Sequence, residues 1–183
     1  MAIDEIADRA MIDLRIAPGE EQARNAAFSV LGFGLPSAPR SSASEGDRAA
    51  LWLSIDQWLI VDASNHRQAL FEGLSAALDG HFAAVTDLSD ARAIIRLTGQ
   101  GAGLILMKGL HPDLSQAGTR AGSVRRGALA GLDAIVHVVG PAPETIDIFV
   151  DRSVADHAWS WLARAARPDA AVTPFSRQEP PPA

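Results

Sequence analysis

Hydrophobic and polar residues alternate in short runs along the chain, and these runs predict strands interleaved with helices. The strand patterns occupy Met11–Ile16, Leu51–Val61, Phe82–Asp87, Ala93–Thr98, Ala134–Val139 and Thr145–Val150. Within Leu51–Val61 the pattern predicts a hairpin that turns at Asp56. Its apolar residues fall on both faces, so we expect both faces to be covered. The last two ranges flank a Gly-Pro-Ala-Pro turn and predict a second hairpin.

Apolar residues at helical spacing recur between these strands. The predicted helices run from Glu20 to Leu31, Asn65 to Leu78, Gln100 to Leu110 and Val154 to Ala166. Asn65 with Gln68 has the spacing of a capping box, and Ser153 with Asp156 repeats that spacing before the last helix. The polar stretch Pro36–Gly46 predicts a loop. No internal repeat is evident in the sequence.

Strands interleaved with helices, together with a hairpin, predict an α+β fold with a largely antiparallel sheet. The chain has 183 residues, of which 48% are hydrophobic, enough to bury a sizeable core. We expect residues 1–167 to form one globular domain, or two small lobes that share a core. Residues 168–183 end in Glu-Pro-Pro-Pro-Ala and predict a flexible tail.

Composition excludes several classes of function. The net charge of −6 argues against a nucleic acid or an anionic membrane as partner. The chain has no cysteine, which removes disulfides, thiolate metal sites and a cysteine nucleophile. No stretch approaches 18 apolar residues, and the acidic N-terminal segment does not resemble a signal peptide. We therefore expect a soluble cytoplasmic protein.

Two short motifs carry candidate chemistry. The turn Gly99–Gly103 follows a predicted strand and opens a helix, where a phosphate-binding loop would lie. Its G-x-G-x-G spacing departs from the dinucleotide fingerprint and favours a tight turn. Asp87 and Asp90 flank Leu-Ser and would suit acid–base chemistry or a hard metal ion, but the same residues favour a turn.

The remaining polar residues do not predict a catalytic set. The five histidines are scattered without zinc-ligand spacing. Ser153, Asp156 and His157 lie close in sequence, but helix capping already accounts for the first two. Arg125 and Arg126 form a basic cluster that would meet an acidic partner or lie in a solvated loop. We therefore predict no catalytic, cofactor-binding or metal-binding residue in this chain.

The tryptophans suggest packing and partner contacts. Trp159 and Trp161 are two positions apart and project about 200° apart around a helix, so one of them can enter the core while the other faces a second layer or a partner. Aromatic side chains dominate interface energetics. The interface candidates are Trp52, Trp58, Trp159, Trp161, Arg125 and Arg126.

Four blocks of sequence, in this order and spacing, together resemble the gamma subunit family of heterotetrameric sarcosine oxidase. The blocks are LGFGLPSAPR (31–40), LWLSIDQWLIV (51–61), TDLSDARAIIRLTGQGAGLILMKGLHPDL (86–114) and DRSVADHAWSWLARAA (151–166). The resemblance implies a fold similar to the folate-binding T-protein (aminomethyltransferase) of the glycine cleavage system. It further implies a non-catalytic, structural role in a complex that demethylates sarcosine to glycine and passes the one-carbon unit to tetrahydrofolate.

In that family FAD, FMN, NAD and tetrahydrofolate are held by other subunits, so the implied partners of this chain are the alpha, beta and delta subunits. The isolated chain would be free to form a homo-oligomer. Two alternatives stay open. One is a stand-alone folate-binding or one-carbon transfer protein of T-protein-like fold, with Asp87 or Asp90 on the pterin. The other is a homo-oligomeric binding module whose turn Gly99–Gly103 holds an anion.

Overall fold

A computed structural model describes residues 1–111, 120–142, 144–167 and 170. The predicted tail at 168–183 falls outside these residues, apart from residue 170. The strands are β1 (Ala2–Glu5), β2 (Arg9–Ile16), β3 (Ser42–Glu45), β4 (Arg48–Ser54), β5 (Gln57–Ala63), β6 (Ala83–Asp87), β7 (Arg92–Thr98), β8 (Val124–Leu129), β9 (Leu132–Pro141) and β10 (Glu144–Asp151). The helices are α1 (Glu21–Leu31), α2 (Arg67–Ala77), α3 (Ala102–Leu106) and α4 (Ala155–Ala165), with 3-10 turns η1 (Ser64–His66) and η2 (Arg152–Val154).

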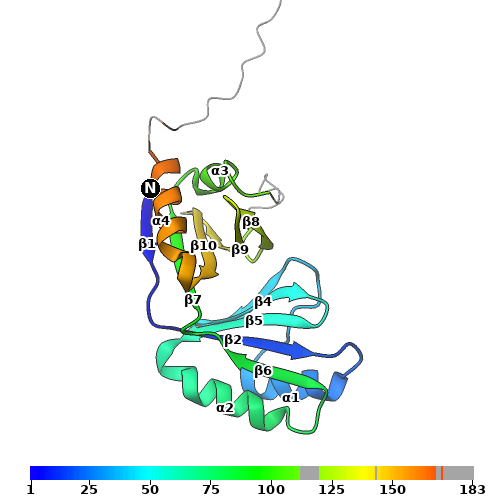
Figure 1. Cartoon of the computed structure of the whole chain (residues 1–183). Helices are drawn as coiled ribbons and strands as arrows, with labels where there is room; N and C mark the ends of the chain where they lie inside the picture. The colour runs from blue at the N-terminus through cyan, green and yellow to red at the C-terminus, as the bar shows by residue number, and fades with distance from the viewer. Residues whose placement is uncertain (112–119, 143, 168–169, 171–183) are drawn as a thin grey trace, which may run out of the picture.

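The strands form two five-stranded sheets. Sheet A has the order β1-β7-β10-β9-β8, and sheet B has the order β3-β4-β5-β2-β6. Every strand pair within them is antiparallel. Figure 1 shows the sheets stacked, with α1 and α2 on the outer face of sheet B and with α3 and α4 beside sheet A. The prediction of an α+β fold with largely antiparallel sheets is confirmed.

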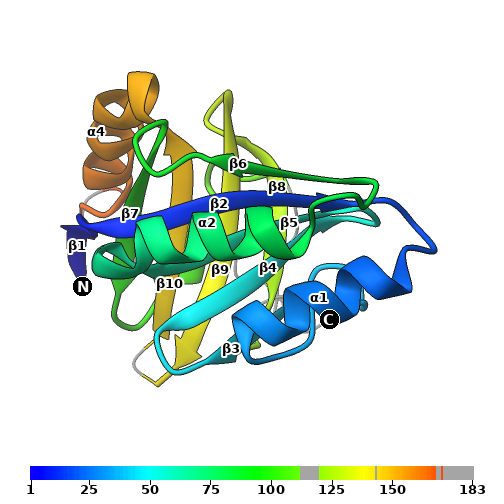
Figure 2. The same ribbon diagram turned by 90° about the horizontal axis from the view of Figure 1, so that it is seen from below.

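The strands of the two sheets run across one another, as the view from below shows (Figure 2). The chain passes from sheet A to sheet B between β1 and β2, and returns between β6 and β7. Backbone hydrogen bonds hold both crossings, because the Ile6 amide donates to the Ile94 carbonyl at 2.9 Å and the Leu88 amide donates to the Met11 carbonyl at 2.8 Å. The sheets are therefore tied to each other at this corner as well as packed face to face.

The period-2 patterns of the strands explain these layers. In β2, Ile12 and Leu14 are fully buried beneath α1 and α2, while Met11 points the other way, into the space between the sheets. The apolar layer between the sheets consists of Met11, Leu51, Leu59, Ile94, Val124, Ile135 and Phe149. The hairpin β4–β5 contributes to both layers, which confirms the expectation that its two faces are covered.

The two sheets repeat one arrangement that the sequence did not reveal. In sheet B the order β2–α1–β3–β4–β5–α2–β6 along the chain gives the spatial order β3-β4-β5-β2-β6. In sheet A the order β7–α3–β8–β9–β10–α4 gives the corresponding spatial order β8-β9-β10-β7. The position that β6 holds in sheet B is held in sheet A by β1, from the opposite end of the chain.

Three local predictions are wrong. Pro36–Gly46 is not entirely loop, because it contains β3, which pairs with β4. Asn65 does not cap α2, since His66 holds the N-cap position without a side-chain capping bond and Gln68 bonds to Glu72 instead. The Ser153 cap is also absent, because Val154 precedes α4 and makes no side-chain capping bond.

Candidate functional site

A row of polar side chains interrupts the apolar layer between the sheets. Arg96 on β7 lies directly opposite Asp147 on β10, and Asp147 lies opposite His137 on β9. Directly opposed residues of antiparallel strands point to the same face. One row further along that face, the register aligns Ile94 with Phe149. The inner face of sheet A is therefore divided into an apolar row, which sheet B covers, and this polar row.

Arg96 and Asp147 form a bidentate ion pair. The Nε of Arg96 lies 2.6 Å from Asp147 Oδ1, and its Nη2 lies 2.8 Å from Oδ2. The side chain of Asp147 is only 11% exposed and that of Arg96 is 28% exposed. Two hydrogen bonds in a planar fork hold both groups in one orientation, and they raise the pKa of Arg96. The pair fixes one guanidinium in the space between the sheets.

His137 joins the two sheets through a serine. Its Nε2 lies 3.0 Å from the Ser42 hydroxyl oxygen, and that hydroxyl also lies 3.1 Å from the Gly122 carbonyl oxygen, to which it can donate. Burial lowers the pKa of His137 to about 4, with Asp147 raising it and Arg96 lowering it further. The imidazole is therefore neutral near pH 7 and can accept a hydrogen bond at one ring nitrogen.

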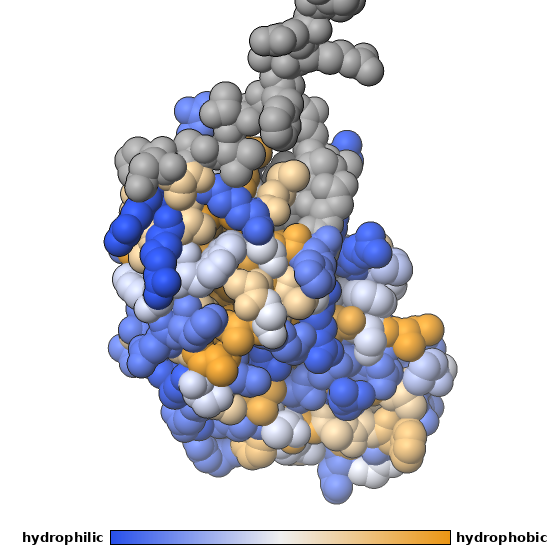
Figure 3. Space-filling model, turned by 45° about the horizontal axis from the view of Figure 1, so that its top comes forward, coloured by the Kyte–Doolittle hydropathy of each residue, from blue (hydrophilic) through white to orange (hydrophobic). Residues whose placement is uncertain are grey.

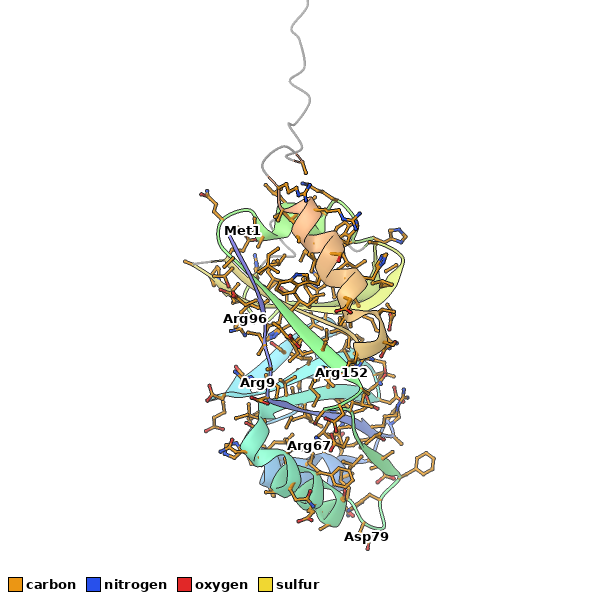
Figure 4. The ribbon with its side chains drawn as sticks, turned by 60° about the vertical axis from the view of Figure 1, so that its left-hand side comes forward. Met1, Arg9, Arg67, Asp79, Arg96 and Arg152 are labelled. Carbon is orange, nitrogen blue, oxygen red and sulfur yellow. The ribbon has the colours of Figure 1, made fainter. Side chains whose placement is uncertain are left out.

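A cavity of about 510 Å³ opens beside this row, in the space between the sheets. Its lining combines apolar side chains (Ile6, Ala49, Val61, Ile94, Val139 and Phe149) with charged and polar ones (Arg9, Arg48, Arg96, Asp47, Asp147, His137, Ser42 and Ser44). Figure 4 shows Arg96 and Arg9 along the side where the chain passes from β1 to β2. A cavity of this size with a few convergent polar groups has the character of a small-molecule site.

The turn Gly99–Gly103 is a strand-to-helix turn, and its amides already hold a carboxylate. Gly99 and Gly101 have positive φ angles of 126° and 88°. The amides of Gly101 and Gly103 each donate to a carboxylate oxygen of Glu144 at 3.0 Å. The anion that this turn binds in the structure is therefore a side chain of β10.

Asp87 and Asp90 take part in a structural network. The Arg67 guanidinium lies 2.6 Å from Asp87 Oδ2 and 2.8 Å from Asp90 Oδ2. Asp87 also accepts hydrogen bonds from the Ser89 amide and hydroxyl. Burial acts to raise the pKa of Asp87, but these bonds and Arg67 outweigh it and hold the pKa below its usual range. The Asp-Leu-Ser-Asp segment is thus a turn whose acids are paired.

The other candidate groups do not converge. Ser153, Asp156 and His157 are all exposed at the start of the α4 region. Across the described ranges no three His, Asp or Glu side chains are placed to hold a metal ion. On the face that Figure 3 shows, hydrophobic residues form several small areas separated by hydrophilic ones.

The interface candidates lie in different environments. Trp58 is fully buried, where its indole N–H donates to the Pro36 carbonyl at 2.9 Å. Trp52 and Trp161 are partly buried against the cores of sheets B and A, whereas Trp159 is 39% exposed. On β8, Arg125 donates to the Val124 carbonyl, and Arg126 lies 3.4 Å from Asp133.

The polar row of Arg96, Asp147 and His137 was not among the sequence candidates. One signal was available: each charged or polar residue stands within a run of Ile, Leu, Val and Phe. Charged residues at inward-facing strand positions mark either an ion pair or a site. Their juxtaposition depends on the strand register, which the sequence alone does not give.

Comparisons with known proteins support one family. Residues 18–168 match the family described as "Sarcosine oxidase, gamma subunit family". A curated relative from Arthrobacter sp., "Sarcosine oxidase subunit gamma", is 36% identical over 117 residues, which are 62% of this chain and 55% of that protein. The match thus spans about half the length of the curated relative. Among the described residues no helix has the length and hydrophobicity needed to cross a membrane.

Two solved structures share the fold. A chain of the heterotetrameric sarcosine oxidase from Corynebacterium sp. U-96 superposes with a TM-score of 0.84 at 28% identity, covering 94% of this chain and 86% of that one. Glycine cleavage system aminomethyltransferase T from Bartonella henselae gives 0.65 at 15% identity, covering 87% of this chain and 44% of that one. The predicted similarity to the T-protein fold is confirmed.

Proposed function

The chain belongs to the sarcosine oxidase gamma subunit family, and we propose that it serves as the gamma subunit of a heterotetrameric sarcosine oxidase. The observation that carries this proposal is the family match over residues 18–168, joined by the superposition on a chain of the Corynebacterium enzyme over 94% of this chain. The complex would demethylate sarcosine oxidatively to glycine and pass the one-carbon unit to tetrahydrofolate.

The role of this chain in the complex is structural. Its partners would be the alpha, beta and delta subunits, which would hold FAD, FMN, NAD and tetrahydrofolate, in the cytoplasm. The reactive side chains in the described part of the chain support this division of labour. Asp87 and Asp90 are paired with Arg67, and Glu144 occupies the glycine turn.

Partner contacts would use side chains that reach the surface. Trp159, at 39% exposure, and Arg126, whose side chain is 47% exposed, are available to a neighbouring subunit. Trp52 and Trp161 are partly buried and could contact a partner only through their exposed parts, whereas Trp58 is fully buried in the core. Arg125, the neighbouring residue on β8, projects to the opposite face of the strand and would make a separate contact.

A tagged form of the full chain, purified from its native cell, tests this function. We expect it to bring down subunits much larger than 19.3 kDa, to give a yellow complex with flavin absorbance, and to oxidise sarcosine. Trp159→Ala should weaken recovery of the large subunits while the chain keeps its fold. A colourless chain recovered alone from cells that oxidise sarcosine would contradict the proposal.

The alternative of a stand-alone folate-binding protein has less support. The likeness to aminomethyltransferase T, at 15% identity, concerns the fold alone, and this chain covers 44% of that protein. Asp87 and Asp90, the acids assigned to the pterin in that alternative, both contact Arg67. A tetrahydrofolate titration of the isolated chain should therefore be flat.

A further inference from the structure

The cavity between the sheets contains a cation that the chain itself does not neutralise. Arg9, at the start of β2, lines this cavity and also a smaller one of about 150 Å³ on its other side. In the described part of the chain its guanidinium has no hydrogen bond or ion pair, unlike Arg96 and Arg48. A partly buried guanidinium beside an apolar surface presents donors to whatever enters the cavity.

The other charged groups on the cavity wall are mostly satisfied. Arg48 lies 2.7 Å from Asp62 and also donates to the Val30 and Leu31 carbonyls. Arg96 is held by Asp147 through Nε and Nη2, which leaves Nη1 for a further bond. Asp47 is the remaining carboxylate of the lining, and it is exposed in the β3–β4 turn. Asp4 on β1 lies opposite Arg96 in the register and raises the pKa of Arg96, but Asp4 is exposed and outside the lining, so the charge that remains inside the cavity is positive.

The imidazole beside this pair adds a third open group. Ser42 occupies Nε2 of His137 at 3.0 Å, while Nδ1 has no hydrogen bond to any residue that the structure describes. Beside these groups, Ile6, Val61 and Val139 line the cavity with partly exposed apolar side chains, while Ile94 and Phe149 are buried under sheet B. The cavity thus combines guanidinium donors and an imidazole with partly exposed aliphatic side chains.

From this arrangement we infer that the cavity between the sheets binds a small organic carboxylate with an apolar body. The carboxylate would lie against Arg9 and the free Nη1 of Arg96, with the apolar body against Ile6, Val61 and Val139. A partly buried ion pair is seldom worth more for stability than the hydrophobic residues that could replace it. A ligand-binding role explains why an otherwise apolar sheet face carries one. This site is independent of the proposed role as a subunit.

Calorimetric titration and thermal unfolding of the full chain test the inference with four probes. Benzoate supplies both a carboxylate and a ring, benzamide keeps the ring without the charge, benzylamine reverses the charge, and acetate lacks the ring. We expect benzoate to bind and to raise the Tm, and the other three to bind about tenfold or more weakly, since a charge-assisted hydrogen bond is worth a factor of about 10 or more.

Two matched variants locate the site. Arg9→Gln should lower benzoate affinity about tenfold and leave the Tm of the free chain nearly unchanged, because Arg9 holds no protein group. Arg92→Gln is the control, since the Arg92 side chain also makes no hydrogen bond or ion pair within the described part of the chain and lines the smaller cavity instead. It should bind benzoate as the unaltered chain does.

A third variant tests the cavity itself rather than its charge. Val139→Trp, from a lining position that is 41% exposed, should narrow the cavity and lower benzoate affinity in a folded chain. The inference is overturned if benzoate does not bind, if benzamide or benzylamine binds equally well, or if Arg9→Gln and Arg92→Gln behave alike.

Discussion

The two sheets share one strand order but differ in what they place on the face between them. Sheet B contributes apolar side chains such as Met11, Leu51 and Leu59 to the shared layer. Sheet A contributes one apolar row and, beside it, the row of Arg96, Asp147 and His137. Sheet B also lines the cavity, through Arg9, Ser42 and Ser44, so the two halves differ in the opposed ion pair that sheet A adds two residues beyond its apolar row.

The helices differ between the halves as well. α1 and α2 each have 11 residues and cover sheet B. Beside sheet A, α3 has 5 residues and α4 has 11, so α4 covers more of that sheet than α3 does. Trp161 of α4 packs so closely on Gly109 that a Cβ there would lie 2.4 Å from the indole ring. In the half built on sheet A, a close contact between Trp161 and Gly109 therefore accompanies the shorter helix α3.

The largest expected effect comes from removing a core side chain beneath sheet B. Trp58→Ala removes a fully buried side chain, its hydrogen bond to the Pro36 carbonyl and the Arg24 guanidinium stacked 4.8 Å from its ring. We expect a loss of about 4 kcal/mol in the free energy of unfolding, measured by urea denaturation. Phe28→Ala, at a position 51% exposed, is the control and should change stability by about 0.5 kcal/mol or less.

Urea denaturation also tests whether the two halves unfold together. We propose that residues 1–167 unfold as one cooperative unit, because both sheets bury side chains in one shared layer. Trp58→Ala should then shift a single transition seen by fluorescence and by circular dichroism. Two separated transitions would instead mean two independently stable lobes.

The next effect concerns the polar row. Asp147→Asn leaves the Arg96 guanidinium partly buried without its counter-charge, and we expect a loss of about 3 kcal/mol. The double variant Arg96→Leu with Asp147→Leu should recover most of this stability, because no charge is then stranded. Asp133→Asn, in the exposed pair with Arg126, should change stability by about 0.5 kcal/mol or less. A double variant as unstable as the single one would make the pair a structural requirement of sheet A.

A smaller effect should appear as a dependence on pH. The pKa of His137 is about 4 in the folded chain, against about 6.5 when unfolded. The folded state therefore binds fewer protons in this window, so the contribution is complete above pH 6.5 and is lost as the pH falls towards 4. Allowing for partial exposure, we expect about 2 kcal/mol of lost stability over that interval. His137→Gln should flatten this dependence, whereas the exposed His157→Gln should leave it unchanged.

The sequence predicted what depends on local pattern and missed what depends on pairing between distant segments. The alternation in Met11–Ile16 and the apolar stripe of α2 were sufficient to locate those elements. Strand β3 carries the sequence SASE, which has no apolar alternation, and it is a strand because β4 pairs with it. The predicted caps failed because the residues they required bond elsewhere or not at all.

The same distinction applies to the site. Arg96 and Asp147 are 51 positions apart, and only the β7–β10 register brings them together. Ser42 and His137 are 95 positions apart and lie on different sheets. The glycine turn was predicted as a turn from its composition, but its carboxylate partner, Glu144, is supplied by a strand about 40 positions later.

The smallest expected change in stability concerns Glu144, and it gives a further difference between the two halves. Glu144→Ala leaves the amides of Gly101 and Gly103 without an acceptor, at a turn with no counterpart in sheet B, where α1 follows β2 after Pro-Gly-Glu. We expect a loss of about 1 kcal/mol, because these amides are part-buried and water can replace the carboxylate. Asp79→Ala, an exposed acid after α2, is the matched control and should have no effect. If added phosphate restored the stability of Glu144→Ala alone, the turn would have an intrinsic affinity for anions that Glu144 satisfies within the fold. If phosphate had no effect, the carboxylate would act only as a clamp between β10 and α3.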